Sequence, residues 1–362
     1  MPGARGLFLW AGADVHADFD VPVLTTGRST PSALGVRRGV PQLSPHSASA
    51  FTHAAGVKWR WAGYRTAHLF SPTTLGVGVH FTQPMQPHSK PSKVAALVPA
   101  WQSSAFIQAT LDSLSAQTYP HLEVIVSVDE CNDSTYEICI AHAQKDARFR
   151  VIRQSQRLGY VGNCNFLLNQ AEADYVLFAF HDDILNPDYI TLLAEVLDAR
   201  PEVVMSYSDV HLTNTNGTEE HWVFTELEGV RDPVQRGVLM MSGKNKWWVP
   251  NRGLFRLGQA RQINGLKTHH AGEFSADWPW LFHMSLLGEF ARVPKTLCYK
   301  YYKPGSLSRS WQFSKHQIYE VYAAIMREIW ISGLTTEQKL TLASPLARWL
   351  YHNNPDRLGE GK

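Results

Sequence analysis

Residues 93–200 alternate between short uncharged runs and segments in which apolar residues recur every three or four positions. Runs of this kind, with β-branched, aromatic and small residues, predict strands buried on both faces, and the spaced segments predict helices. The predicted strands are 93–99, 123–128, 150–153 and 175–180, and the predicted helices are 105–117, 135–147 and 163–171. Residues 159–162 read as a turn before the last helix. This order predicts an α/β fold with a mostly parallel sheet, right-handed crossovers and functional loops at the strand ends.

Acidic residues stand where two of these strands end. Asp182 and Asp183 follow the strand 175–180, and Asp129 follows the strand 123–128. Open α/β sheets bind ligands at the carboxyl ends of their strands. Two adjacent carboxylates repel one another unless water or a cation stabilises them, so the pair fits a divalent metal shared with phosphate oxygens. A solvated Asp-Asp turn explains the pair alone equally well.

Several motifs, in order and spacing, resemble the family 2 glycosyltransferases of the GT-A fold. The resemblance covers roughly residues 93 to 312, and no single motif would carry it. In the first half the motifs are Val98-Pro99-Ala100-Trp101, Leu114-Ser-Ala-Gln-Thr-Tyr-Pro120, Leu122-Glu-Val-Ile-Val-Ser-Val-Asp129, Arg157-Leu-Gly159, Asn163-Cys-Asn165 and His181-Asp-Asp183. In the second half they are Ala276-Asp277-Trp-Pro-Trp280, Leu287-Gly-Glu-Phe290, Val293-Pro294 and Tyr302-Lys-Pro-Gly-Ser-Leu-Ser308.

This resemblance implies a binding site for a nucleotide-diphosphate sugar. Asp183 would be the direct ligand of a divalent cation, Mn²⁺ or Mg²⁺, which stabilises the leaving diphosphate as a Lewis acid. Asp182 would lie nearer the ribose and the sugar. Asp129 would accept the imide N–H of the base, although an Asx-turn is the alternative role for it. Pro99 and Ala100 would begin the loop that lies against the nucleoside.

The resemblance also places a catalytic base at Asp277. An acceptor hydroxyl needs a carboxylate to take its proton as it attacks the anomeric carbon. Asp277 begins a predicted amphipathic helix through Trp280 and Leu287, where it would also serve as an N-cap. Glu273 is the second candidate. One base without a carboxylate nucleophile implies inversion at the anomeric carbon.

Two departures from the family pattern weaken the implication of a metal. Lys303 stands where many relatives have a histidine, and an ammonium group cannot ligate a metal. His181 precedes the Asp pair where a third acid is usual. Lys303 would then contact the diphosphate directly, or else be a solvated surface lysine.

The region from Ser206 to His270 is harder to interpret. The segment 205–209 predicts a further strand, whose last residue, Asp209, would approach the donor sugar. Trp247 and Trp248 would stack on sugar faces or pack in the core, and the sequence favours neither.

Composition agrees with a globular protein. The chain has 362 residues, a formal charge of +2, 44% hydrophobic and 18% charged residues, and this balance implies no nucleic-acid partner. Its four cysteines form no Cys-x-x-Cys pair, which favours a reducing compartment and a cytoplasmic location. No apolar run reaches the roughly 20 residues of a membrane helix.

The chain divides into three predicted parts. Residues 1–92 contain eight Lys or Arg and three acids without periodicity, so we expect a disordered extension or a segment upstream of a true start at Met85. A basic tail of this kind also suits peripheral association with an acidic membrane surface. Residues 93–312 form the predicted GT-A domain. Residues 313–362 have helical spacing and predict helices that pack on the domain or on a partner.

The function that follows is an inverting glycosyltransferase in polysaccharide or glycoconjugate synthesis. It would use a nucleotide-diphosphate sugar and a saccharide or lipid-linked acceptor. Two alternatives stay open: a nucleotidyltransferase that makes such sugars, and a non-catalytic nucleotide-sugar-binding subunit. A dehydrogenase is disfavoured, because Gly159-Tyr-Val-Gly162 is not a dinucleotide-binding Gly-x-Gly-x-x-Gly turn.

Overall fold

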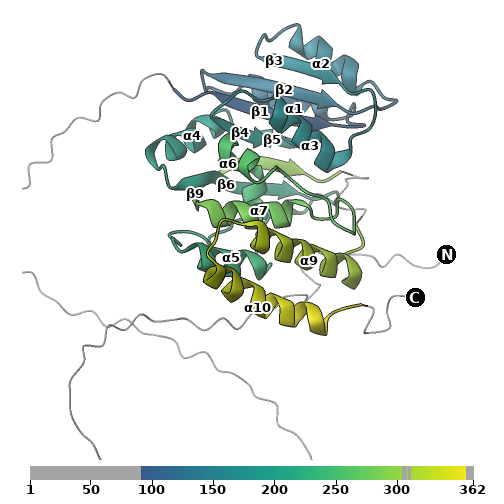
Figure 1. Ribbon diagram of the computed structural model, residues 1–362. Coiled ribbons are helices and arrows are strands. Elements are labelled where there is room, and N and C mark those ends of the chain that lie inside the picture. Colours follow the sequence, from purple (N-terminus) through teal and green to yellow (C-terminus); the bar gives the residue numbers. More distant parts are fainter. Residues whose placement is uncertain (1–90, 304–307, 309–310, 356–362) are drawn as a thin grey trace, which may run out of the picture. The chain divides into compact units, whose positions relative to one another are not determined.

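The computed structural model describes residues 91–303, 308 and 311–355 (Figure 1). The predictions for residues 1–90 lie outside this part of the chain, and the division into three parts stays a prediction. No helix in the described ranges combines the length and apolarity that crossing a membrane requires.

The first half of the described chain is the predicted alternation of strands and helices. Val94 pairs with Leu122 on one side and with Tyr175 on the other, both in parallel register, so the first strand lies between its two neighbours. The elements in chain order are β1 (Val94–Ala100), α1 (Ile107–Ser115), β2 (Leu122–Val128), α2 (Thr135–Ala143), β3 (Phe149–Arg153), α3 (Gly159–Gln170) and β4 (Tyr175–Phe178). The α/β fold with parallel strands is therefore confirmed in this half.

The second half extends the same sheet with mixed strand directions. Its elements are β5 (Asp183–Leu185), α4 (Tyr189–Ala199), β6 (Val203–Thr213), β7 (Glu219–Trp222), α5 (Pro233–Met241), the 3-10 helix η1 (Val249–Arg252), β8 (Leu254–Arg256), α6 (Leu257–Gln262), α7 (Asp277–Leu287) and β9 (Glu289–Tyr301). The strand order is β3-β2-β1-β4-β8-β6-β9-β5, with β7 paired to β6. Strands β6 and β9 are parallel, whereas β8 is antiparallel to both β4 and β6, and β5 to β9.

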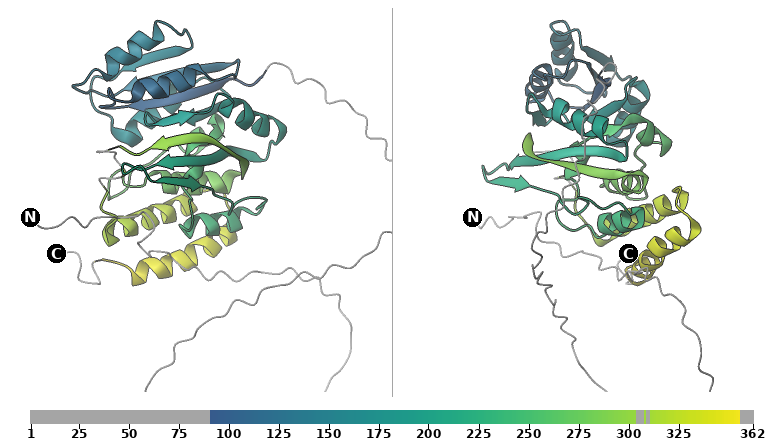
Figure 2. Two further views of the ribbon diagram at one scale, coloured as in Figure 1. Left: turned by 180° about the vertical axis from the view of Figure 1, so that it is seen from behind. Right: turned by 90° about the vertical axis from the view of Figure 1, so that its left-hand side faces the viewer.

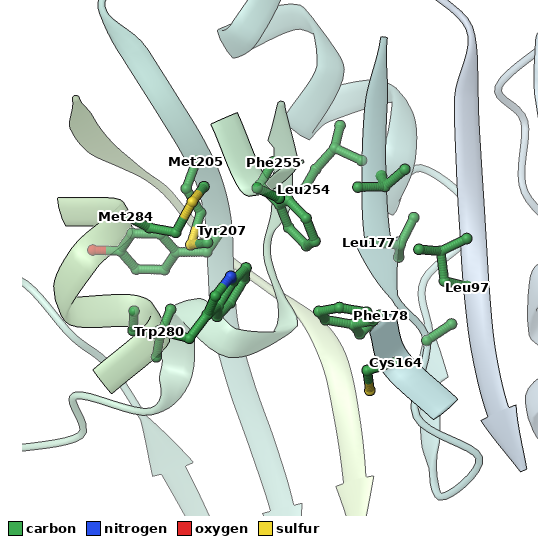
Figure 3. Close-up of a cluster of buried hydrophobic side chains, with 14 of the residues drawn as sticks. Leu97, Cys164, Leu177, Phe178, Met205, Tyr207, Leu254, Phe255, Trp280 and Met284 are labelled. Atoms are coloured by element: carbon green, nitrogen blue, oxygen red, sulfur yellow. The ribbon is translucent and has the colours of Figure 1, made fainter. Parts of the chain in front are cut away.

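A continuous apolar core joins the two halves (Figure 3). Phe178 of β4 packs against Phe255 of β8, and both rings contact the edge of Trp280 from α7. Met205 and Tyr207 of β6 are fully buried beside them. Because α7 packs directly on the strands of both halves, its position relative to the sheet is fixed by close packing rather than by a flexible linker.

Helix α7 differs from the prediction of an amphipathic helix, since all its residues from Trp278 to Leu286 are buried. Helices α5 and α9 (Lys315–Ile331) explain this, because both pack on α7, and the last helix, α10 (Thr336–His352), packs in turn on α9 and α5 (Figures 1 and 2). Tyr322 of α9 packs edge-on against Trp278. An apolar helix surface is buried here by helices far along the chain, so periodicity within α7 carries no signal of it.

A buried ionic cluster fastens α9 to the end of α7. Glu328 is 1% exposed and accepts hydrogen bonds from Lys267 Nζ and His283 Nδ1, each at 2.8 Å, and from Arg327 Nε at 3.0 Å. A buried carboxylate is tolerated when several donors satisfy it in this way.

Two local predictions differ from the structure. Residues Gly159–Gly162 form the first turn of α3 rather than a separate turn before it. Asp277 begins α7, but the residue before it is Ala276 and no side chain caps the helix, so Asp277 is not an N-cap.

Candidate active site

A pocket of about 650 Å³ opens at the carboxyl ends of β1, β2 and β4 and is also lined by residues of α7 and β9. This is the edge of the sheet at which the sequence predicted a site. Six of the residues predicted to form the site line the pocket: Pro99, Ala100, Asp129, Asp182, Asp277 and Lys303. The other two, Asp183 and Asp209, are not among its lining residues.

Asp129 is one of the acids that line the pocket. It follows β2 directly, and its backbone N–H donates to the Ala100 carbonyl at 2.9 Å, which joins the ends of two neighbouring strands. Its Oδ2 accepts the Gly159 N–H at 3.0 Å, whereas its buried Oδ1 has no hydrogen-bond partner among the described residues. Burial raises the pKa of Asp129, and hydrogen bonds from the backbone at 158–159 oppose that rise. A buried acceptor without a partner is costly, so this oxygen suits a ligand N–H.

Asn163 presents a second buried acceptor in the same pocket. Its Nδ2 donates to the Ser127 carbonyl at 3.1 Å, and this bond fixes the orientation of the amide. Its Oδ1 is therefore the free end, buried and without a partner in the described ranges. The guanidinium of Arg157 stacks on Trp101 with its carbon 3.7 Å from the ring centroid. The two acceptor oxygens suit the hydrogen-bonding edge of a nucleobase, and the stacked side chains of Arg157 and Trp101 suit its flat face.

Glu273 fixes the start of α3 rather than acting as a free base. Its carboxylate accepts the N–H groups of Tyr160 at 3.2 Å and Val161 at 2.8 Å, where the helix has unsatisfied donors. Gly159 has φ +78°, and a Cβ there would lie 2.8 Å from Glu273 Oε1. The glycine is thus required both by its backbone conformation and by the approach of the carboxylate.

Four charged side chains meet at the pocket, from β9, η1, β5 and the residue just before β5. Lys300 of β9 lies opposite Asp183 in the β5–β9 ladder, and its Nζ is 3.2 Å from Asp183 Oδ1 and 3.0 Å from Asp182 Oδ2. Arg252 of η1 donates from Nε to Asp183 Oδ2 at 3.2 Å. Although burial raises the pKa of Asp182, the Lys300 ammonium and neighbouring cations lower it to about 2. Asp182 is therefore ionised, and both acids are held by cations of the protein.

Asp183, the acid expected to ligate a metal directly, is buried inside the protein instead. It is 2% exposed and both of its oxygens are paired with Arg252 and Lys300, whereas Asp182 lines the pocket. The assignment of Asp183 is therefore corrected: successive side chains on an extended segment point to opposite sides, and it is Asp182 that faces the pocket.

The residues of the pocket do not fit a divalent cation. Three of the four oxygens in the Asp pair are already held by an ammonium or a guanidinium group. No cluster of three or more His, Cys, Asp or Glu with metal-binding geometry occurs in the described part of the chain. Hard cations need free oxygen ligands, and an adjacent Lys and Arg repel them.

Lys303 also lines the pocket, as the sequence allowed. Its Nζ lies 3.8 Å above the Phe106 ring, a cation–π contact that directs the ammonium group inward. Next to it, His181 Nδ1 donates to the Pro99 carbonyl at 3.0 Å, since a carbonyl can only accept. His181 therefore ties the loop before the Asp pair to the end of β1.

Asp277 lines the pocket from the start of α7. Burial raises its pKa to about 6, while the Arg252 guanidinium opposes that rise. Asn251 Nδ2 donates to Asp277 Oδ2 at 3.0 Å, and the buried Asn251 Oδ1 has no partner among the residues described. A carboxylate with a pKa near 6, held in one orientation, has the properties of a general base.

Asp209 is not where the sequence placed it. It lies on β6, 3% exposed, and forms a bidentate ion pair with Arg292 of the parallel strand β9, at 2.6 and 2.8 Å. The prediction took the strand to end at Asp209, but β6 continues to Thr213, so the residue lies within the sheet rather than at its edge.

Tryptophans line the pocket near Asp277. Trp247 stacks on Trp278 with centroids 4.5 Å apart, and Trp248 meets Trp222 edge to face. Trp222, Trp247 and Trp248 are largely buried, yet all three border the pocket. The two predicted roles of Trp247 and Trp248, packing in the core and stacking on a sugar, are therefore compatible, because a packed ring can still present one edge or face to the pocket.

Sequence reasoning assigned no role to Lys300, Arg252, Asn251 or Asn163. The signal for Lys300 was its place near the end of an extended segment, two residues before Tyr302, and both residues line the pocket. Its partner, however, depends on the β5–β9 register. Arg252 and Asn251 lie on a single 3-10 turn, which has no periodic pattern.

Comparisons with known proteins give two kinds of sequence match, to a family profile and to curated relatives. The family profile described as Glycosyl transferase family 2 matches residues 95–259. Residues 95–259 therefore form a glycosyl transferase family 2 domain. Among curated relatives from this family, glycosyltransferase GlyA of Streptococcus pneumoniae serotype 4 is 29% identical over 138 residues, which are 38% of this chain and 18% of GlyA. TarS of Staphylococcus aureus, a poly(ribitol-phosphate) β-N-acetylglucosaminyltransferase, is 31% identical over 128 residues, which are 34% of this chain and 21% of TarS. The chain spans less than half the length of these relatives.

Solved structures confirm the predicted GT-A glycosyltransferase fold of this family 2 chain. S. aureus TarS 1–349 in complex with UDP-GlcNAc has a TM-score of 0.55 at 20% identity, covering 74% of this chain and 75% of that one. The mannosyltransferase PcManGT from Pyrobaculum calidifontis, in complex with GDP-Man and Mn²⁺, has a TM-score of 0.50 at 16% identity, covering 75% and 73%.

Proposed function

We propose that this family 2 chain transfers a sugar from a nucleotide-diphosphate sugar to an acceptor hydroxyl, with inversion at the anomeric carbon. The observation that carries the proposal is that one pocket brings together three kinds of group. Its walls hold the unpartnered acceptors of Asp129 and Asn163, the cations Lys300 and Arg252, and the carboxylate of Asp277. A nucleotide sugar needs one of each, for its base, its diphosphate and the reaction at its anomeric carbon.

The proposed chemistry uses residues of the chain alone. The acceptor oxygen attacks the anomeric carbon while the bond from that carbon to the diphosphate oxygen breaks, and the bonding electrons leave with the diphosphate. Asp277 takes the proton of the acceptor hydroxyl, and Asn251 holds the carboxylate in position. The positive side chains stabilise the charge that develops on the leaving group.

The unpartnered acceptors support recognition of a nucleobase N–H. The carboxylate of Asp129 would accept it, with the amide oxygen of Asn163 as a second acceptor. TarS was solved with UDP-GlcNAc and with UDP, and PcManGT with GDP-Man, so donors with uracil and with guanine are the first to test.

The tryptophan-lined part of the pocket favours a saccharide acceptor, because aromatic faces stack on sugar rings. Lys246, whose Nζ lies 5.3 Å from the Trp222 ring centroid, would add attraction for an anionic acceptor group. A role in cytoplasmic polysaccharide or glycoconjugate synthesis, with a saccharide or lipid-linked acceptor at a membrane surface, is part of this proposal.

Donor hydrolysis tests the proposal without knowledge of the acceptor. The full chain would be incubated with a panel of UDP-, GDP-, CDP-, ADP- and dTDP-sugars, and release of nucleoside diphosphate would be measured with and without monosaccharide acceptors. We expect release from one class of donor and loss of release in Asp277→Asn. Binding of a donor without turnover under any condition would favour the non-catalytic subunit, and release of pyrophosphate from nucleoside triphosphate and sugar phosphate would favour the nucleotidyltransferase.

A further inference from the structure

The Asp pair in the pocket is held by cations of the protein. Asp182 and Asp183 contact Lys300 and Arg252 at 3.0 to 3.2 Å, and Lys303 lines the same pocket. Fixed ammonium and guanidinium groups in these positions attract an anion and repel a second cation.

The pairing of strands β5 and β9 fixes the position of Lys300. The residue is 5% exposed and stands directly opposite Asp183 in the antiparallel ladder of β5 and β9. Its ammonium group bridges the two acids while still bordering the pocket. A buried lysine in contact with two carboxylates keeps its charge, because both partners favour the charged form.

Around this cluster, apolar and aromatic groups take positions that free oxygen ligands would need. The Phe180 ring borders the pocket and lies 5.4 Å from the Arg252 guanidinium carbon, and the Phe106 ring lies under Lys303. Aromatic faces stabilise a cation but offer no ligand to a metal. The walls of the site therefore favour fixed organic cations over a hard metal ion.

We propose that Lys300 and Lys303 bind the diphosphate of the donor directly, so that nucleotide binding in this chain needs no divalent cation. The inference rests on the proposed function and concerns the same pocket. Lys303 approaches the phosphate oxygens from the wall of the pocket, and Lys300 does so from between the two acids. Arg252 stays on Asp183 and holds the acid beneath them. As the bond to the sugar breaks, both ammonium groups stabilise the diphosphate without giving up a proton.

The primary test compares nucleotide binding with and without metal in the unmodified chain. UDP, GDP, ADP, CDP and dTDP would each be screened by thermal unfolding in EDTA and in MnCl₂, and the best ligand titrated by calorimetry in both. We expect one nucleotide to bind in EDTA with an affinity within about threefold of that in MnCl₂, since the charge is supplied by the protein. Binding only in MnCl₂ overturns the inference and leaves the proposed function standing. No binding in either condition overturns the proposed donor, and the inference with it.

Variants that remove one charge at a time test which lysines bind the diphosphate. In EDTA, Lys303→Met and Lys300→Met should each weaken the best nucleotide about tenfold or more, the range for losing a charge-assisted hydrogen bond. Lys295→Met is the matched control, because Lys295 is an exposed lysine on the same strand and should change affinity by less than about twofold. Unchanged affinity in both pocket variants would overturn the direct contacts.

Lys300→Met provides a second readout that needs no nucleotide. Removing the bridging ammonium frees oxygens on both acids, so this variant should gain Mn²⁺ binding by electron paramagnetic resonance titration, whereas the unmodified chain should show none at this site. If Lys300→Met does not fold, Lys303→Met with inorganic pyrophosphate as the probe keeps the test independent of that variant. Tight Mn²⁺ binding by the unmodified chain that Asp182→Asn abolishes would contradict the inference.

Discussion

The side chain of Asn251 holds Asp277 by a hydrogen bond of 3.0 Å from Nδ2 to Oδ2, and its own Oδ1 is buried at the pocket wall. A donated hydrogen bond favours the ionised carboxylate, while burial of Asp277 disfavours it. Asn251 therefore holds the proposed base in one orientation, while burial raises the pKa of Asp277 and the Arg252 guanidinium opposes that rise. It is a positioning residue, one turn before the β8 strand.

Asp277→Asn should abolish catalysis while leaving donor binding intact. The amide keeps the shape of the side chain but cannot take the acceptor proton, so turnover should fall about 100-fold or more. Steady-state release of nucleoside diphosphate and calorimetric donor affinity measure the two effects. Turnover within a few-fold of the unmodified chain would move the base elsewhere.

The pH profile should follow ionisation of Asp277. Its pKa is raised to about 6, and the proposed base works only when deprotonated, so turnover should fall as the pH decreases through about 6. Asn251→Ala removes a hydrogen bond to the ionised form, so the midpoint should rise by about one pH unit. The exposed Asn169 on α3 provides the control variant Asn169→Ala, which should leave the midpoint in place. An unshifted midpoint in Asn251→Ala would remove the positioning role.

The two adjacent acids should differ in their effect on stability. Asp183 is fully buried between Arg252 and Lys300, so Asp183→Asn should lower the free energy of unfolding by about 2–4 kcal/mol. Asp182 borders the pocket, and Asp182→Asn should lower it by about 1 kcal/mol or less. Urea denaturation of both variants gives the comparison. Equal losses would argue against the different positions of the two side chains.

Glu273 should stabilise helix α3 rather than take the proton of the acceptor hydroxyl. Glu273→Ala removes two hydrogen bonds to N–H groups in the first turn, so stability should fall by about 1–2 kcal/mol. Donor affinity should also decrease, because the Gly159 N–H that binds Asp129 shifts with that turn. Turnover with saturating donor should fall less than about tenfold. A loss of turnover as large as in Asp277→Asn would return Glu273 to the role of base.

Asp209 and Arg292 should stabilise the fold through their mutual interaction and should not affect the affinity for the donor. Their ion pair is bidentate and largely buried. Asp209→Asn and Arg292→Met should each destabilise the chain, and a double-mutant cycle should give an interaction energy of about 1–3 kcal/mol. Donor affinity should be unchanged in both single variants. A tenfold weaker donor affinity in Asp209→Asn would restore the predicted approach to the sugar.

Much of the fold was accessible from sequence because its signals are local. The buried strands from Val94 to Phe178 are short uncharged runs, and their alternation with helices determines the parallel half of the sheet. Acids placed at strand ends then predict the pocket edge, and five of the six pocket residues named in advance lie directly at strand ends or helix starts. Lys303, the exception, follows the end of β9 by two residues.

The remaining parts of the site depend on relationships between distant segments. Whether Asp182 or Asp183 faces the pocket is decided by Lys300, more than 100 residues later, through the register of an antiparallel pair. Asp209 was misplaced because the end of β6 is set by pairing with β7 and β9 and not by its own residues. Contacts of this kind have no signature within a single window of sequence.

The anchoring of α7 by Glu328 also has a consequence for the order in which the chain can mature during synthesis. The strands that present Asp129 and Asp182 are synthesised before residue 200, whereas Lys300 and the Glu328 carboxylate on α9, which bonds His283 of the helix that carries Asp277, follow more than 90 residues later. On a ribosome that adds about 5–20 residues per second, the proposed nucleobase site is made seconds before the proposed diphosphate and catalytic groups. A nascent chain should therefore form the site for the base before it is able to hold and use a whole donor.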